Sequence, residues 1–214
     1  MSKLDEVNNE DEPIKIILLG NTSVGKTAII TRFDQDNFNE NLPSTFSPNY
    51  IEKTLNINNN QVKINVWDTA GQEKFKSVSK LFIKNSKIVI LVYDVTNKES
   101  FTALKFWYDF LKNEYESNVI LGLAGNKVDR INEDNCNEEV SDEEGEELAK
   151  KLGAIFSLLS AKCDKKGIDD FFLKLVKKYL NESNRETPKR ESIRIVKEDL
   201  KKETNIKAGH KGCC

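Results

Sequence analysis

This 214-residue chain has little of the chemistry on which many protein classes depend. It contains one histidine and four cysteines, too few and too scattered for a disulfide framework or a histidine-based metal site. Its longest apolar run, IVILVY, is too short to cross a bilayer, and its polar, acidic N-terminus resembles neither a signal nor a transit peptide. The net charge of −2 provides no basic excess for nucleic acid. We therefore expect a protein of a reducing cytosol that binds no nucleic acid.

Short apolar strands alternate with amphipathic helices along most of the chain. The pattern predicts strands at residues 14–20, 50–57, 61–68, 87–95, 118–126 and 154–161, and helices at 26–33, 100–116, 141–152 and 168–180. The asparagines of residues 58–60 separate the second and third strands as a hairpin turn, whereas helices separate most of the others. We therefore predict an α/β fold of three layers, with a six-stranded, mostly parallel sheet that has one antiparallel edge strand.

Two of these helices have a recognisable N-terminal signal. Ser100 is predicted to cap the helix of residues 100–116, because a serine hydroxyl can accept a hydrogen bond from an early helical N–H. Ser141 and Glu144 have the spacing of a capping box at the start of the following helix.

Composition divides the chain into three parts. Residues 1–12 form a polar, acidic extension that we expect to be flexible, and residues 13–181 contain all the predicted strands and helices. Residues 182–214 are polar and mixed in charge with almost no apolar periodicity, which predicts a flexible tail. We interpret the acidic stretch 131–147 as a solvated loop and helix start, and Cys136 and Cys163 as ordinary thiols.

The stretch GNTSVGKT, between a predicted buried strand and a helix, matches the phosphate-loop pattern G-x-x-x-x-G-K-[ST]. Its glycines let backbone N–H groups turn toward phosphate oxygens, and the dipole of the following helix favours an anion. Lys26 is predicted to reach the β- and γ-phosphates, and the Thr27 hydroxyl to bind Mg²⁺. The residues expected to cradle the phosphates are Gly20, Thr22, Ser23, Val24, Gly25, Lys26, Thr27 and Ala28. This motif serves ATP and GTP alike.

The nucleotide base is predicted from the ends of two later strands. In GNKVD, Asp129 can accept hydrogen bonds from N1–H and the exocyclic amine of guanine, a donor pair that adenine lacks. Asn126 and Lys127 are expected to brace the base and the phosphate loop. In SAK, the backbone N–H of Ala161 is placed near the guanine carbonyl, between Ser160 and Lys162. The two tripeptides at successive strand ends predict a guanine site.

The stretch WDTAGQEKF, residues 67–75, supplies the candidate catalytic groups. Asp68 ends a strand and can hold Mg²⁺ through water. Gly71 leaves its N–H free to meet a γ-phosphate, and Gln72 is placed to orient an attacking water.

Together these motifs resemble the Ras superfamily of small GTPases, and most closely the Rab family. The resemblance covers about residues 13–181 and the terminal Cys-Cys, and it rests on KINVWDTAGQEKF, LVYDVTNKESF, GNKVD and EEGEELAKKLGA. It implies a P-loop G domain that binds GTP or GDP with Mg²⁺. It also implies that Thr45 closes on Mg²⁺ and the γ-phosphate and that Phe38 packs against guanine. The effector surface that it implies consists of Phe46, Tyr50, Trp67 and Phe82.

The resemblance also implies how GTP is hydrolysed. Gln72, Thr45 and Lys26 would be catalytic, and Thr27, Thr45 and Asp68 would hold the metal. The sequence contains no identifiable arginine finger, so unaided hydrolysis should be slow, about 10⁻⁴ to 10⁻³ s⁻¹, with a large acceleration by a GTPase-activating protein. In the GTP state Thr45, in the segment called switch I, and Gly71, in the segment called switch II, would hold the γ-phosphate. Its loss would relax both segments.

The resemblance places this switch on a membrane. Cys213 and Cys214 match a C-terminal motif that accepts two geranylgeranyl groups, and two lipid chains anchor a protein durably where one does not. The expected location is the cytoplasmic face of an endomembrane, with a cytosolic pool. The expected partners of the monomer are a GTPase-activating protein, an exchange factor, a GDP-dissociation inhibitor, a prenylation escort and effectors that act in vesicle trafficking.

Two segments depart from the Rab pattern and leave alternatives open. FSPNY, residues 46–50, replaces the usual residues after the switch I threonine, and KLFIKNS replaces a tyrosine-rich stretch after switch II. Both changes fall on the effector-facing surface, so no Rab subtype is assigned. One alternative is a nucleotide-locked scaffold with an altered switch I. An ATP-using P-loop kinase is a second, against which Asp129 argues.

Overall fold

A computed structural model describes residues 12–40, 45, 49–69, 83–114, 119–131 and 139–184. The chain separates into two compact units, Met1–Val176 and Lys177–Cys214. The first unit contains every strand of the sheet, and the described part of the second, residues 177–184, is helical. None of the helices described is long and apolar enough to span a bilayer.

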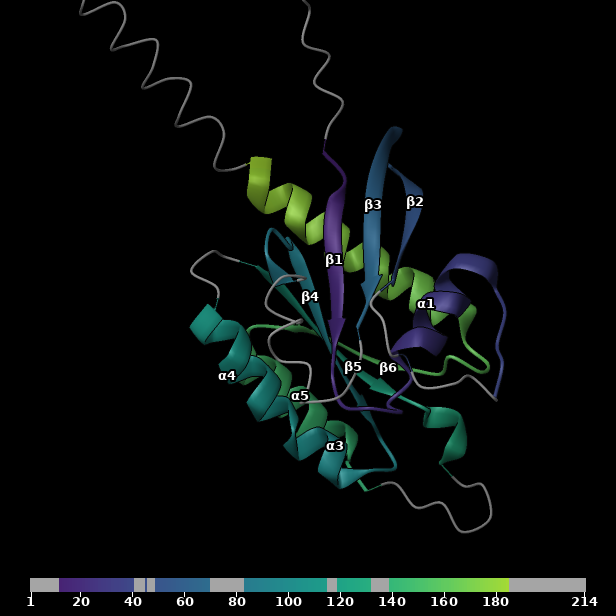
Figure 1. Cartoon of the computed structure of the whole chain (residues 1–214), viewed down its shortest axis with the longest axis vertical. Coiled ribbons are helices and arrows are strands. Elements are labelled where there is room, and N and C mark those ends of the chain that lie inside the picture. Colours follow the sequence, from purple (N-terminus) through teal and green to yellow (C-terminus); the bar gives the residue numbers. More distant parts are fainter. Residues whose placement is uncertain are drawn as a thin grey trace, which may run out of the picture. The chain divides into compact units, whose positions relative to one another are not determined.

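The first unit is built on a six-stranded sheet with the strand order β2-β3-β1-β4-β5-β6 (Figure 1). The strands are β1 (Ile14–Leu19), β2 (Asn49–Ile57), β3 (Asn60–Asp68), β4 (Ile88–Asp94), β5 (Ile120–Asn126) and β6 (Ile155–Leu159). β2 lies at one edge and pairs antiparallel with β3, whereas all other neighbours are parallel. The predicted fold class, with its antiparallel edge strand, is confirmed.

Helices cover both faces of this sheet (Figure 1). On one face, α4 (Leu104–Glu114) and α5 (Asp142–Leu152) pack their buried Trp107, Leu111 and Ala149 into a core with alternate residues of β1, β4 and β5. On the other, α1 (Lys26–Gln35) and the helix of residues 165–176 meet where Phe33 stacks on Phe172, with ring centroids 4.0 Å apart. The central strands β1 and β4 are therefore buried on both faces, which is why they read as continuous apolar runs.

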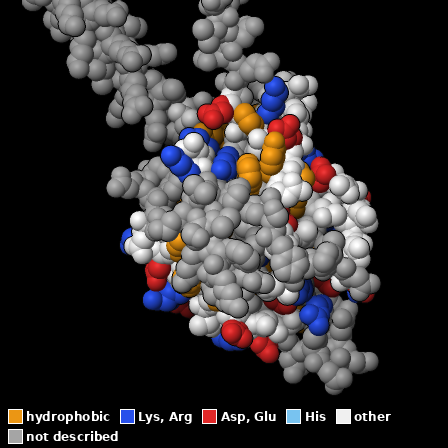
Figure 2. All heavy atoms as spheres, in the orientation of Figure 1, with side chains coloured by type: hydrophobic (Ala, Val, Ile, Leu, Met, Phe, Trp, Pro, Cys, Tyr) orange, Lys and Arg blue, Asp and Glu red, His pale blue; other side chains and the backbone are white. Residues whose placement is uncertain are grey.

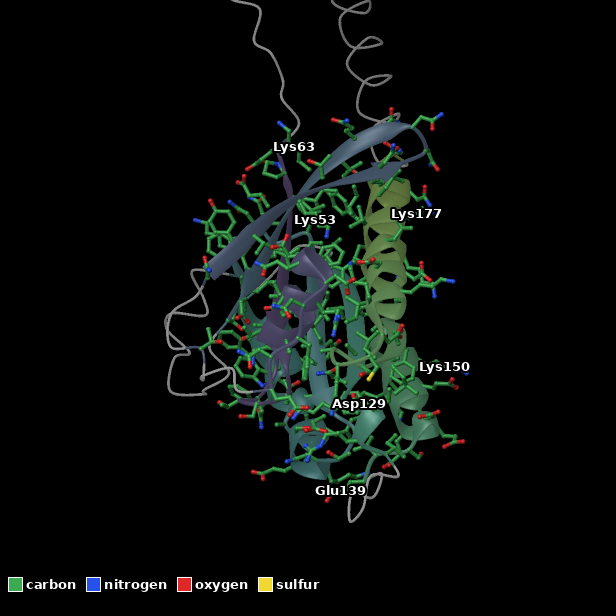
Figure 3. The ribbon with its side chains drawn as sticks, turned by 90° about the vertical axis from the view of Figure 1, so that its right-hand side faces the viewer. Lys53, Lys63, Asp129, Glu139, Lys150 and Lys177 are labelled. Carbon is green, nitrogen blue, oxygen red and sulfur yellow. The ribbon has the colours of Figure 1, made fainter. Side chains whose placement is uncertain are left out.

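The hairpin between β2 and β3 turns at the predicted asparagines. Asn58 and Asn59 have φ angles of 52° and 66°, in the left-handed region that asparagine tolerates better than most residues. This turn leaves Lys63 near one end of the first unit, whereas Asp129, which follows β5, lies toward the opposite end of that unit (Figure 3). The carboxyl ends of the parallel strands thus lie far from the hairpin.

The helix predicted to begin at Ser100 begins earlier and is divided. The structure has a short α3 (Lys98–Thr102) followed by α4, and the N-cap is Asn97, whose side chain accepts a hydrogen bond from the Ser100 N–H at 2.8 Å. The prediction of a Ser100 cap is wrong because Asn97 caps an earlier start, which places Ser100 inside the first turn of α3. The hydroxyl of Ser100 instead donates to the Asn97 carbonyl at 2.7 Å.

The other helix starts have clear local causes. The capping box at α5 is confirmed, since Ser141 and Glu144 each accept a hydrogen bond from the other's backbone N–H. The last helix begins at residue 165, earlier than predicted, because the Asp164 carboxylate accepts a hydrogen bond from the Gly167 N–H at 2.8 Å. Asp164 therefore acts as the cap of that helix.

Candidate nucleotide-binding site

The predicted phosphate loop connects β1 to α1 and has an unusual backbone. Gly20, Ser23 and Gly25 have φ angles of 151°, 64° and 96°. A Cβ atom on Gly20 would lie 2.2 Å from the Val92 carbonyl oxygen, and one on Gly25 would lie 2.3 Å from Nδ2 of Asn126. Glycine is therefore required at both positions, because the loop passes directly against β4 and the end of β5.

Lys26 lies inside this loop at the first position of α1. Its buried ammonium donates hydrogen bonds to the carbonyl oxygens of Gly20 and Asn21, both at 2.9 Å. Burial lowers the pKa of Lys26 to about 8, against the opposing effect of the Asp68 carboxylate. Gly25 has no side chain to cap the first N–H groups of α1, so a positive helix end and a buried cation face the same place. Phosphate oxygens would satisfy both.

The three predicted metal ligands come together from three separate segments. The Oγ1 atoms of Thr27 and Thr45 lie 2.7 Å apart, and Thr27 Oγ1 donates to Oδ2 of Asp68 at 2.7 Å. Thr45 Oγ1 also reaches Asp68 Oδ2, at 3.3 Å. Thr27 lies at the start of α1, Thr45 precedes β2, and Asp68 ends β3.

Asp68 has the properties expected of a group that faces a cation. Its Oδ1 atom is buried and makes no hydrogen bond within the part of the chain described. Burial raises the pKa of Asp68, while the Thr27 hydrogen bond and the charge of Lys26 oppose that rise. Two hydroxyls and a carboxylate are oxygen donors of the kind that Mg²⁺ prefers, and Mg²⁺ usually completes its shell with water and substrate phosphates. The residues therefore fit this ion. No group of three or more His, Cys, Asp and Glu side chains that could hold a metal occurs among the described residues.

A cavity of about 450 Å³ opens beside the phosphate loop. Eight predicted nucleotide-binding residues line it, together with Glu40 and Arg130; the eight are Gly25, Ala28, Phe38, Asn126, Lys127, Asp129, Ala161 and Lys162. The cavity lies at the carboxyl ends of β5 and β6, where ligands of open α/β sheets bind.

Hydrogen bonds hold the polar groups of this cavity in place. Asn126 donates from Nδ2 to the Val24 carbonyl at 2.9 Å, and its Oδ1 accepts from the Ala161 N–H at 3.2 Å. Ser160 donates from Oγ to Oδ1 of Asp129 at 2.6 Å. Asn126 thus joins the phosphate loop to the segment that follows β6, and Ser160 orients the carboxylate that we expect to read guanine.

Several residues at this site were not predicted from the sequence. Asp94, the last residue of β4, forms an ion pair with Lys127, at 2.6 Å between Oδ2 and Nζ. Trp107 donates from Nε1 to Oδ1 of Asn21 at 3.1 Å, and Glu40 pairs with Lys162 at 3.0 Å. Asp94 could have been found from the sequence, because it ends a strand as Asp68 does. The other contacts join segments far apart in sequence.

The candidate effector surface is partly described. Tyr50 and Trp67 are register partners on β2 and β3 and stack with ring centroids 4.6 Å apart. Nζ of Lys15 lies 4.8 Å from the Trp67 ring centre, and Tyr50 is 43% exposed. Figure 2 shows hydrophobic side chains gathered over the upper part of β3.

The remaining predicted positions have simple outcomes. Thr22 and Ser23 are exposed on the phosphate loop, and Val24 is buried beneath it. Six predicted residues lie outside the described part of the chain; they are Phe46, Gly71, Gln72, Phe82, Cys213 and Cys214. Their roles stay predictions.

One comparison with known proteins bears on this site. A family model described as Ras family matches residues 15–181, from β1 through most of the last helix.

Proposed function

The chain belongs to the Ras family, and from this we propose that it is a Rab-like switch that acts in vesicle trafficking. Members of this family bind GTP and GDP with Mg²⁺ and interact with regulators, and this chain is accordingly a small GTPase. The Rab assignment rests on the quoted motifs and on the terminal Cys-Cys. The nucleotide part and the membrane part of the proposal are tested separately.

The observation that carries the nucleotide part is the convergence of Thr27, Thr45 and Asp68 beside Lys26. Lys26 and the start of α1 would neutralise the phosphates, while the cavity edged by Asp129 and Ala161 would hold the base. Mg²⁺, when bound, would withdraw charge from the β- and γ-phosphates.

Hydrolysis would need one further group, the side chain of Gln72. It would orient a water whose oxygen forms the new bond to the γ-phosphorus as the bond to the bridging oxygen of GDP breaks. The proton lost by water ends on the released phosphate, so that GTP and water become GDP and inorganic phosphate. Thr45 would hold the γ-phosphate side of the site until that product leaves.

Base selectivity and rate test this part together. Labelled GDP bound to the purified chain should be displaced by unlabelled GDP but not by the same concentration of ADP. The chain's single-turnover hydrolysis of GTP should run at about 10⁻⁴ to 10⁻³ s⁻¹, and a GTPase-activating protein should raise that rate by up to about 10⁵-fold. Competition by ADP, or fast unaided hydrolysis, would contradict the proposal.

We propose that Cys213 and Cys214 carry lipid groups and hold the protein on the cytoplasmic face of an endomembrane, with a cytosolic pool. Support comes from the terminal Cys-Cys and from the need for two lipid chains for durable attachment. Replacing both with serine should move the protein to the soluble fraction of cells, while a Cys163→Ser control should not. Membrane association that survives the double change would refute the lipid anchor.

A second candidate is a nucleotide-locked scaffold, favoured by the FSPNY sequence that follows Thr45. Pro48 lacks an N–H and has a restricted φ, which would oppose a rearranging switch I. Partner capture from matched samples loaded with GDP or a slowly hydrolysed GTP analogue separates the two. A switch captures different partners in the two states, and a locked scaffold captures the same ones.

A further inference from the structure

Arg32 contacts the base-recognition segment from outside the cavity. It lies on α1, and its Nε donates to the Ala161 carbonyl at 2.8 Å while its Nη2 donates to the Lys162 carbonyl at 2.6 Å. The cavity-lining residues that the structure describes do not include Arg32. The guanidinium therefore binds two successive carbonyls of the segment without touching the space in which a base would lie.

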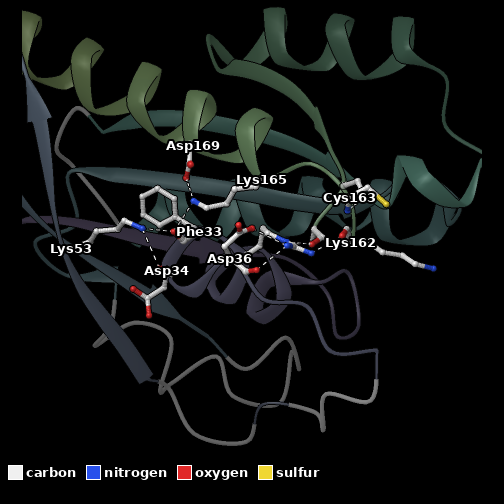
Figure 4. Close-up of polar contacts among 11 residues, drawn as sticks. Phe33, Asp34, Asp36, Lys53, Lys162, Cys163, Lys165 and Asp169 are labelled. Atoms are coloured by element: carbon white, nitrogen blue, oxygen red, sulfur yellow. Dashed lines mark hydrogen bonds and ion pairs between the residues drawn. The ribbon is translucent and has the colours of Figure 1, made fainter.

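A second contact holds Arg32 itself in place. Its Nη1 donates to the carboxylate of Asp36 at 2.9 Å and to the Asp36 carbonyl at 3.1 Å (Figure 4). The side chain of Arg32 is only 14% exposed. A planar guanidinium holds its donors in a rigid fork and so is pre-organised for these contacts, whereas the single nitrogen of a lysine would have to make all of them from one point.

Arg32 and Asn126 hold the two sides of Ala161. The Ala161 N–H points to Oδ1 of Asn126, a residue of the cavity wall, while the Ala161 carbonyl is held on the side of α1. Holding the carbonyls of Ala161 and Lys162 fixes the two peptide planes that follow the Ala161 Cα. The Ala161 N–H belongs to the preceding peptide group, which shares the Ala161 Cα with the part that Arg32 fixes, and Oδ1 of Asn126 accepts its hydrogen bond from the cavity wall. With that Cα held from α1, the N–H stays on the cavity side, where the 6-oxo group of guanine would meet it.

Arg32 also connects the two ends of the proposed nucleotide site. It lies on the same helix as Lys26 and Thr27, which face the proposed phosphates and metal. An α-helix transmits position with little deformation, at about 1.5 Å per residue. The contacts of Arg32 therefore fix the position of the Ala161–Lys162 segment relative to α1, the helix that would bind the phosphates.

We propose that Arg32 is a positioning residue for guanine selectivity, which holds the Ala161–Lys162 segment so that the Ala161 N–H meets the 6-oxo group. This inference rests on the proposed binding of guanine in the cavity. A purely structural role would stabilise the fold without affecting recognition of one position of the base more than another. The test therefore compares recognition of the 6-oxo group with recognition of the 2-amino group.

The experiment measures binding of GDP, 6-thio-GDP and IDP to the full chain with Mg²⁺. 6-Thio-GDP changes the acceptor that the Ala161 N–H would read, whereas IDP lacks the 2-amino group that Asp129 would read. In Arg32→Ala, release of GDP should become about tenfold faster, because two charge-assisted hydrogen bonds are lost. The preference for GDP over 6-thio-GDP should shrink, while the preference for GDP over IDP should stay.

Three further variants control the experiment. Lys105→Ala removes an exposed cation from another helical i,i+4 pair, with Asp109, and should change neither preference. Asp36→Asn leaves the carbonyl contacts of Arg32 possible and should keep most of the selectivity. Arg32→Lys should be intermediate, and it carries the comparison if Arg32→Ala does not fold.

The outcomes separate this inference from the proposed function. If the unmodified chain binds ADP as well as GDP, the guanine site itself is wrong. If it selects GDP but Arg32→Ala and Arg32→Lys leave the GDP to 6-thio-GDP ratio unchanged, or reduce both ratios equally, the positioning role is wrong. A selective loss at the 6-position supports it.

Discussion

Gly20 and Gly153 both have a positive φ, yet their surroundings predict different costs for an added methyl group. Gly153 ends α5 with φ 66° and has open space around it, so Gly153→Ala should cost only backbone strain, about 1 kcal/mol. Gly20→Ala should cost roughly 2 kcal/mol more, because its Cβ would collide with the Val92 carbonyl of β4. Urea unfolding of the two variants measures the difference. Equal losses would mean that the loop moves freely away from β4.

Asp68 has opposite effects on metal binding and on the stability of the empty protein. Asp68→Asn should weaken Mg²⁺ binding by about 10- to 100-fold. The measurement is the Mg²⁺ concentration that gives half of the maximal slowing of GDP release. With EDTA and no nucleotide, the same change should not lower stability, because burial already raises the pKa of Asp68 and disfavours its charge. Asp109→Asn, on an exposed face of α4, is the matched control. Unchanged Mg²⁺ dependence would remove Asp68 from the metal site.

At the scale of elements, Glu144 links the start of α5 to α3. Its carboxylate accepts a hydrogen bond from the Lys98 ammonium and another from the Ser141 N–H, and these contacts lower the pKa of Glu144. A lowered carboxyl pKa gives stability that is present at neutral pH and is lost as the pH falls through the folded-state pKa. Glu144→Gln should therefore destabilise the protein at pH 7, by an amount that shrinks as the solution becomes acidic.

Chemical unfolding across this pH range tests the link between the two helices. Glu146→Gln, an exposed change in the same helix, is the control and should show a smaller loss at pH 7. A Glu144→Gln deficit that stays constant from neutral to acidic pH would show that the side chain acts without its charge.

Element boundaries show which parts of the fold local sequence could predict. The strands and the α5 capping box follow from short-range patterns, because their determinants lie within a few residues. The start of α3 at Lys98 was missed because Asn97 and Ser100 can both cap a helix, and local chemistry alone does not rank them. Asp164, which caps the last helix, is an equally ordinary turn residue until its hydrogen bond is seen.

At the scale of the whole molecule, ligand and metal should stabilise the fold together. The proposed site joins α1, the segment before β2 and the ends of β3, β5 and β6, so a bound nucleotide would hold all of them. GDP at 100 times its dissociation constant, with Mg²⁺, should add about 2.7 kcal/mol to the free energy of unfolding. Thermal or urea unfolding measures this gain, and EDTA should remove part of it. An equal gain from ADP would contradict the guanine site.

The sequence by itself determined the α/β class, the antiparallel edge strand, the phosphate loop and the identity of most candidate ligands. These features are local: they depend on apolar periodicity, on glycine at fixed spacing and on polar residues at strand ends. Because parallel strands all end at one edge of the sheet, the rule that joins Thr27, Asp68 and Asp129 into one site could also be applied without coordinates.

Only the tertiary structure decided which side chains contact and orient the predicted binding residues. Arg32 lies 129 positions before Ala161, Trp107 reaches Asn21 from another helix, and Asp94 pairs with Lys127 across two strand ends. Each contact depends on the distance and direction between elements, which arise from packing of the whole core rather than from any local pattern. The sequence therefore predicted the residues that would touch a nucleotide. The fold showed which other side chains form hydrogen bonds and ion pairs with those residues.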